Sequence, residues 1–161
     1  MWKTGHSLIK SKMKETGAML AWEMSGHIFF KERWYGFDDG LYAGARLLEI
    51  LSRQEDIDAA LHSLPDAVST PELQIRMNEG ENYELIAKLQ SDAAFDNPRE
   101  VIKLDGLRVE YEDGFGLARS SNTTPVIVLR FEADSSESLK RIQEDFRRVI
   151  LRARPDAVLP F

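Results

Sequence analysis

The sequence predicts an α+β protein in which an antiparallel sheet, covered by helices on one face, follows a smaller partial α/β part. Apolar residues make up 43% and charged residues 30% of the 161 positions, which is typical of globular proteins. Segments with helical spacing of apolar residues alternate with short strand-like runs separated by turn residues. A stretch rich in proline, serine and threonine near residues 65–72 divides the chain into parts of about 67 and 90 residues.

The first part, residues 1–67, begins with an amphipathic segment. Apolar residues at helical spacing predict a helix from residue 6 to about residue 15, which Gly17 would end. Residues 18–24 are apolar and are expected to form a buried strand, and residues 27–30 form a second apolar piece after a break of small residues.

A second helix is expected directly after the acidic stretch at residues 38–39, where its apolar stripe begins. The two aspartates fit a helix cap better than a metal site, since no Asp-x-Asp-x-Asp cluster is present. A shorter helix is expected within residues 55–64.

The second part, residues 70–161, has the element order of an antiparallel α+β domain. Asp105-Gly106 between two apolar runs is a strong signal for a hairpin. The expected elements are, in order, a strand at 72–77, a helix at 81–94, strands at 101–104, 107–111, 116–120 and 125–133, and a closing amphipathic helix at 136–151.

Composition also limits the function classes. A net charge of −6 without a stripe of lysine and arginine argues against nucleic-acid binding, and no apolar run is long enough to cross a membrane. The absence of cysteine excludes a thiol nucleophile and fits a reducing cytoplasm, where we expect the protein in the absence of a secretory signal. No nucleotide-binding loop or hydrolase elbow is present.

The segment 119–125, with the sequence RSSNTTP, combines a guanidinium with hydroxyl and amide groups between two expected strands. Arginine offers a planar fork that matches a phosphate, and the hydroxyls and turn N–H groups can complete the shell around its oxygens. Serine, asparagine and threonine also favour ordinary β-turns. By composition alone, the ordinary turn is the stronger interpretation, and the phosphate loop is the alternative.

A second polar segment lies between the two apolar pieces of the first part. Within five positions, Glu23, Ser25 and His27 bring together a carboxylate, a hydroxyl and an imidazole. Carboxylates and hydroxyls bind sugar hydroxyls, and histidine transfers protons near neutral pH. Judged alone, a solvated strand end is the more probable interpretation of this segment. His6 fits a helix start and is a further candidate for a ligand contact.

Several of these stretches, in this order, resemble the α-D-phosphohexomutases, and among them the bacterial phosphomannomutase/phosphoglucomutase enzymes. The resemblance runs nearly end to end. The matching stretches are residues 3–10 (KTGHSLIK), 23–27 (EMSGH), 37–40 (FDDG) and 119–125 (RSSNTTP). It implies the end of the family's third domain at residues 1–67 and its fourth, TATA-binding-protein-like domain at residues 70–161.

The resemblance also implies roles for individual residues. Glu23 and Ser25 would bind sugar hydroxyls, His6 would lie near the sugar phosphate, and His27 would be a candidate general acid/base. The implied holders of the phosphate that is not being transferred are Arg119, Ser121, Asn122 and Thr123. In the family a glycine precedes the EMSGH stretch, whereas this chain has Trp22, which we expect to crowd the sugar loop or to require a glycine-like backbone.

The implied reaction interconverts hexose 1-phosphate and hexose 6-phosphate, with mannose or glucose as the sugar. A phosphoserine, Mg²⁺ and a bisphosphorylated sugar serve it, but the family's serine and metal loops lie in earlier domains and do not occur in this sequence. The chain alone is therefore expected to be inactive, to need the N-terminal domains of the same enzyme as partners, and to hold no metal itself. Strands left without neighbours would allow self-association. The alternative is a non-catalytic anion-binding or interaction module that reuses the fold.

Overall fold

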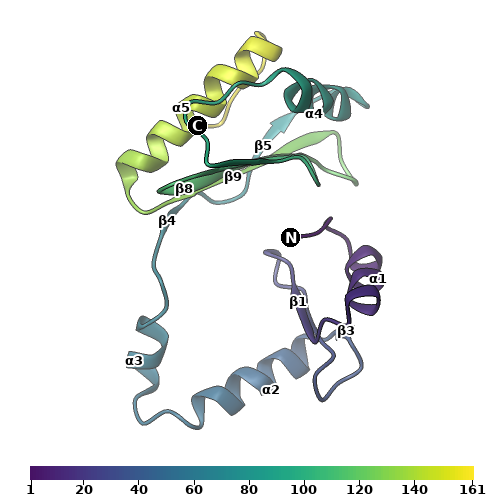
Figure 1. The fold of residues 1–161 in the computed structure, drawn as a ribbon, viewed down its shortest axis with the longest axis vertical. Helices are drawn as coiled ribbons and strands as arrows, with labels where there is room; N and C mark the ends of the chain where they lie inside the picture. Colours follow the sequence, from purple (N-terminus) through teal and green to yellow (C-terminus); the bar gives the residue numbers. More distant parts are fainter. The chain divides into compact units, whose positions relative to one another are not determined.

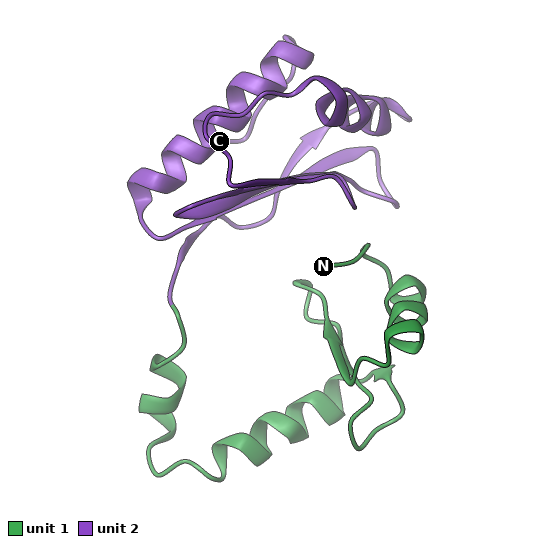
Figure 2. Ribbon diagram, viewed as in Figure 1, with its two compact units in different colours: residues 1–65 green, residues 66–161 purple.

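The computed structural model describes all residues from Met1 to Phe161. The chain forms two compact units, Met1–Pro65 (unit 1) and Asp66–Phe161 (unit 2), which Figure 2 shows in different colours. None of the helices combines the length and the apolar character needed to cross a membrane.

Unit 1 is a three-stranded antiparallel sheet with three helices. Its elements are α1 (His6–Thr16), β1 (Leu20–Trp22), β2 (Ile28–Phe30), β3 (Phe37–Asp38), α2 (Gly40–Leu51) and α3 (Ile57–His62), with strand order β1-β2-β3. Helix α1 ends as expected at Gly17, which adopts a left-handed conformation with φ 70°. The small core joins Ile9 and Met13 of α1 to Phe29 of β2.

The prediction of a buried strand at residues 18–24 is wrong in two respects. The strand is only three residues long, and the side chains of Leu20 and Trp22 are 44% and 69% exposed. Alternate residues of a strand point to opposite faces, so only Ala21 packs against the core. Trp22 pairs with Ile28 as ordinary strand backbone and is not among the residues with positive φ. The expectation that Trp22 needs a glycine-like backbone is therefore also wrong.

Helix α2 begins where the sequence predicts. The Asp39 side chain caps it by accepting a hydrogen bond of 3.0 Å from the backbone N–H of Tyr42. None of the α2 residues is buried, and its apolar side chains stay exposed, with Leu41 at 90% and Leu48 at 67%. The apolar stripe of α2 is thus left uncovered within unit 1.

Unit 2 is an antiparallel sheet with both of its helices on one face (Figure 1), which confirms the predicted fold class. Its elements are β4 (Val68–Ser69), β5 (Leu73–Arg76), α4 (Glu81–Asp92), β6 (Glu100–Ile102), β7 (Leu107–Tyr111), β8 (Gly114–Ser120), β9 (Val126–Ala133) and α5 (Ser136–Ala153). The strand order is β4-β9-β8-β7-β6, with β5 also paired to β9. The predicted hairpin is present, because β6 and β7 pair around the turn that contains Gly106.

The core of unit 2 lies between the sheet and the two helices. Alternate residues of β9, Ile127, Leu129 and Phe131, are completely buried. Phe146 of α5 packs edge-on against Phe131, with ring centroids 5.2 Å apart. This packing fixes β8 and β9, and with them the turn that joins these two strands.

Candidate functional site

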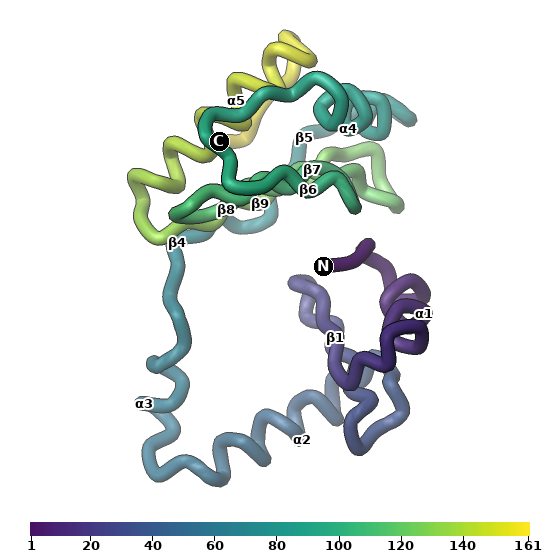
Figure 3. Tube along the Cα trace, viewed as in Figure 1, coloured from purple at the N-terminus to yellow at the C-terminus, as the bar shows by residue number.

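The segment predicted to bind phosphate is the connection between β8 and β9, whose path can be followed in Figure 3. Arg119 and Ser120 are the last residues of β8, and residues 121–125 form the connection. Its base is closed by a hydrogen bond of 3.0 Å from Ser121 N–H to the Val126 carbonyl. Residues 122–125 are exposed, so their polar groups are available to a ligand.

Ser121 organises this connection through its side chain. Its Oγ accepts hydrogen bonds from the backbone N–H groups of Thr123 and Thr124, each 3.3 Å long, and from the Thr124 hydroxyl at 3.0 Å. The hydroxyls of Ser121 and Thr123 lie 3.3 Å apart. The structure therefore brings two of the predicted phosphate-binding residues together, with N–H groups pointing toward one oxygen atom.

Arg119 is the charged residue of this segment and lies near the end of β8, two positions before Ser121. Five arginines of unit 2 form ion pairs, and Arg119 is not one of them; the five are Arg108, Arg141, Arg147, Arg148 and Arg154. The turn at Gly106 lies directly against Arg119: a Cβ atom built on this glycine would be 2.5 Å from the Arg119 Cβ. The backbone of Arg119 is thus packed closely against this turn, and its guanidinium forms no ion pair.

Two residues that the sequence analysis missed hold the connection from the side of α4. Asn82 Nδ2 and the Tyr83 hydroxyl both donate to the Ser121 carbonyl, at 3.2 and 3.3 Å. In return the Ser120 hydroxyl donates to the Asn82 carbonyl at 2.9 Å. Nothing local in the sequence marks these residues, because they precede Ser121 by 39 and 38 positions and only the fold brings them together.

In unit 1, Glu23 joins the polar segment at residues 23–27 to the start of α1. Its carboxylate accepts from the Gly5 N–H at 3.0 Å and from the Ser25 hydroxyl at 3.1 Å. His6 is exposed and its ring lies 5.2 Å from the ring of Phe29. Glu23, Ser25 and the helix start that carries His6 are therefore neighbours. A carboxylate has about four acceptor positions, so Glu23 can still accept from a ligand hydroxyl.

His27 begins the next apolar piece and is half-exposed. Its Nδ1 lies 2.6 Å from Oδ2 of Asp38 in the neighbouring strand β3. The sequence predicts a helix cap for both Asp38 and Asp39, and only Asp39 has that role. Asp38 instead fixes the orientation of the imidazole, which leaves Nε2 as the nitrogen that can exchange a proton with a ligand.

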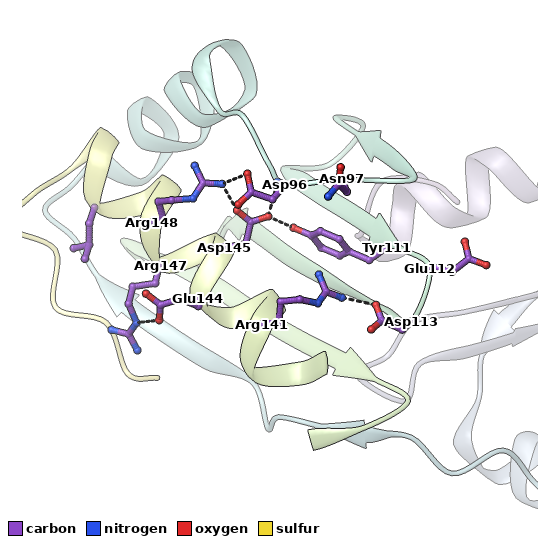
Figure 4. A pocket seen from close by; sticks show the side chains of 11 residues that line it. Asp96, Asn97, Tyr111, Glu112, Asp113, Arg141, Glu144, Asp145, Arg147 and Arg148 are labelled. Carbon is purple, nitrogen blue, oxygen red and sulfur yellow. Dashed lines mark hydrogen bonds and ion pairs between the residues drawn. The ribbon is translucent and has the colours of Figure 1, made fainter. Parts of the chain in front are cut away.

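A depression of about 1040 Å³ in unit 2 lies elsewhere (Figure 4). It adjoins Tyr111, which pairs with Gly114 at the opposite end of β8 from Arg119. Its arginines are neutralised by carboxylates: Arg141 contacts Asp113 and Arg148 contacts Asp145. This depression therefore lacks the free positive charge that a phosphate site needs.

The acidic and histidine side chains form no group of three or more that could hold a metal ion. The described chain thus offers anion donors in unit 2 and a carboxylate, a hydroxyl and an imidazole in unit 1. The donors of unit 2 are of the kind that bind anions, and the groups of unit 1 are of the kind that bind hydroxyls and exchange protons.

Family models match nearly the whole chain. Residues 1–68 match the phosphoglucomutase/phosphomannomutase alpha/beta/alpha domain III, and residues 72–149 match the C-terminal domain of the same family. A phosphoglucomutase of Neisseria meningitidis is 58% identical over 161 residues, which cover 99% of this chain and 35% of that relative. A phosphomannomutase/phosphoglucomutase of Pseudomonas aeruginosa is 55% identical over 162 residues, which cover the whole chain and 35% of that relative.

A solved structure agrees with these matches. The crystal structure of a phosphoglucomutase/phosphomannomutase family protein from Burkholderia thailandensis superposes with a TM-score of 0.93 at 68% identity, over 100% of this chain and 34% of that one. The chain therefore spans about a third of the length of the proteins that it matches. On this evidence, the chain belongs to the phosphoglucomutase/phosphomannomutase family, with residues that match its domain III and its C-terminal domain.

Proposed function

We propose that the chain is the substrate-binding C-terminal part of a phosphomannomutase/phosphoglucomutase, which interconverts hexose 1-phosphate and hexose 6-phosphate. The supporting relatives carry these enzyme names. The observation behind this proposal is that the N–H groups of Thr123 and Thr124 converge on the Ser121 hydroxyl in a segment that begins with Arg119, an arginine without an ion pair. These groups would hold the phosphate that is not being transferred, together with the exposed amide of Asn122.

The groups of unit 1 are the sugar contacts that we propose. The Glu23 carboxylate would accept hydrogen bonds from sugar hydroxyls, and the Ser25 hydroxyl would donate to them. His6 would lie near the sugar phosphate. His27, oriented by Asp38, would exchange a proton with the hydroxyl that gains or loses the phosphoryl group. Phosphoryl transfer depends largely on positioning and charge stabilisation, which these fixed donors provide.

The phosphoserine, Mg²⁺ and bisphosphorylated sugar of the family's reaction would be supplied from outside this chain, since no group of side chains here suits a metal. The remaining domains of such an enzyme are the partners that we propose. The uncovered apolar side chains of α2 and the exposed Leu20 and Trp22 support this, because apolar surface of this kind is usually buried against another element. Self-association through strands without neighbours and location in the cytoplasm are further expectations.

Titration of the 161-residue chain tests the proposal. We expect glucose 1-phosphate or mannose 1-phosphate to bind more tightly than inorganic phosphate, and Arg119→Ala to weaken both by about tenfold or more, as for the loss of a charged hydrogen-bond donor. Equal affinity for inorganic phosphate and sugar phosphates would favour a non-catalytic anion-binding module instead. The chain alone should show no mutase turnover, and turnover by the purified chain would contradict this expectation.

A further inference from the structure

We propose that Asn82 and Tyr83, in the first turn of α4, are positioning residues of the phosphate loop. They hold the Ser121 carbonyl and thereby present the N–H groups of Thr123 and Thr124 to a bound phosphate. This inference rests on the proposed function, because it takes the assignment of phosphate to this loop as given.

The hydrogen bonds between α4 and the loop are reciprocal. A carbonyl oxygen has two lone pairs, and that of Ser121 accepts from both Asn82 Nδ2 and the Tyr83 hydroxyl, at 3.2 and 3.3 Å. The Ser120 hydroxyl donates to the Asn82 carbonyl at 2.9 Å. Three hydrogen bonds thus tie Ser120, the last residue of β8, and Ser121, the first residue of the loop, to one helical turn, which fixes the backbone at the point where the loop leaves β8.

The environment of Asn82 indicates that the function of its amide is to donate a hydrogen bond to the Ser121 carbonyl. The side chain is 1% exposed, and its Oδ1 has no hydrogen-bond partner. The opposite amide orientation would place Oδ1 against the Ser121 carbonyl, so that two acceptors would face each other. A buried acceptor without a donor costs stability, and an apolar residue would avoid that cost. The donor to the Ser121 carbonyl accounts for an asparagine at this position.

The loop can exchange its internal hydrogen bonds for a ligand. Both N–H bonds to the Ser121 Oγ are 3.3 Å long, beyond the usual range for such bonds. A phosphate oxygen would form shorter, charge-assisted bonds with the same N–H groups, and the Ser121 hydroxyl could then donate to the phosphate. The exchange requires Ser121 to keep its backbone position. If the loop had to become ordered on binding, the cost of ordering would lower its affinity for phosphate.

The test uses the isotope-labelled 161-residue chain, titrated with inorganic phosphate and with glucose 1-phosphate while the amide signals of Thr123 and Thr124 are followed. Tyr83 is 51% exposed, so Tyr83→Phe removes one donor without disturbing the core. We expect this variant to raise the Kd about three- to tenfold, and Asn82→Ala to raise it further. Ser91→Ala is the matched control, because the Ser91 hydroxyl bonds only within α4.

The outcomes separate this inference from the proposed function. Parent-like affinity in both Tyr83→Phe and Asn82→Ala, with Arg119→Ala binding weakly, would overturn the positioning role and leave phosphate binding by the loop intact. A lowered unfolding midpoint with unchanged Kd in these variants would show a purely structural role and would also overturn it. If Arg119→Ala binds phosphate like the parent chain, the assignment of phosphate to the loop is itself wrong.

Discussion

His27 Nδ1, in the residue directly before β2, lies 2.6 Å from Oδ2 of Asp38 in the adjacent strand β3 of unit 1. The two residues are 11 positions apart, and the Phe29–Asp38 register of the strands brings them together. A carboxylate at Nδ1 selects the tautomer that carries its proton there, and it leaves Nε2 free to act as a base. This pairing gives His27 an orientation that its own neighbours in the sequence do not provide.

The first prediction concerns this tautomer. In the parent chain the neutral His27 should carry its proton on Nδ1, and in Asp38→Ala the proton should no longer favour Nδ1, because the acceptor is gone. The nitrogen chemical shifts of the imidazole measure this. Asp39→Asn is the control, since asparagine also caps helices and Asp39 does not contact His27. A proton on Nε2 in the parent chain would contradict the orienting role of Asp38.

The second prediction concerns the turn beside Arg119. Gly106→Ala should lower the free energy of unfolding of unit 2 by about 2 kcal/mol or more and should weaken phosphate binding. Gly106 has φ +89°, and a Cβ there would lie 2.5 Å from both the Ala118 carbonyl oxygen and the Arg119 Cβ. Urea unfolding followed by circular dichroism measures the stability.

Gly80→Ala separates the two causes of that destabilisation. Gly80 has a similar φ of +85° but no atom within 4 Å of an added Cβ, so only the backbone strain of about 1–2 kcal/mol should appear. If Gly106→Ala and Gly80→Ala lower the free energy of unfolding equally, the contact of the added Cβ with Arg119 costs no stability.

The third prediction concerns the buried carboxylate of Asp145. It accepts from the Tyr111 hydroxyl at 2.7 Å and from the Asp96 N–H at 2.9 Å, and burial raises the pKa of the Tyr111 phenol above its usual range. Tyr111→Phe removes one donor from a buried charge and should cost about 1–3 kcal/mol of unfolding free energy. In contrast, Tyr83→Phe, which removes a half-exposed hydroxyl, should stay within about 0.5 kcal/mol of the parent chain. If Tyr111→Phe also stays within about 0.5 kcal/mol of the parent chain, the Tyr111 hydroxyl does not stabilise the Asp145 carboxylate.

The fourth prediction concerns the pH dependence of unit 1. The pKa of Glu32 is lowered from its ordinary 4.5 mainly by the hydrogen bond to Arg46, and the pKa of Glu49 is lowered mainly by that to Arg33. Because these bonds are absent in the unfolded chain, their stabilisation is complete above pH 4.5 and is lost as the pH falls from there through the lowered pKa values. The unfolding midpoint of unit 1 should therefore decrease over that range.

Tryptophan fluorescence reports this directly, since all three tryptophans lie in unit 1. The double variant Glu32→Gln/Glu49→Gln should flatten the dependence of the midpoint on pH. Glu15→Gln is the control, because the Glu15 carboxylate is 65% exposed and pairs only with Lys12 on its own helix. The prediction is wrong if the double variant follows the same pH profile as the parent chain.

Much of the fold could be predicted from the sequence because the signals are local. Gly17 ends α1 in the left-handed conformation that glycine adopts easily, and Asp39 caps α2 through its own side chain. The turn at Gly106 and the amphipathic stripe of α5 likewise depend on residues close in sequence. The burial of residues 18–24 could not be predicted, since an apolar run does not reveal whether another element covers it.

Side-chain chemistry and spacing along the chain are enough to predict the residue types of the candidate site, the turn between β8 and β9, and the order of the strands and helices. The folded arrangement is needed to show that Asp38 contacts His27 instead of capping a helix, and that Asn82 and Tyr83 hold the Ser121 carbonyl. These contacts are hydrogen bonds between segments that are distant in the sequence. Their geometry is set by strand register and by packing of α4 on the sheet, and neither leaves a periodic signal along the chain.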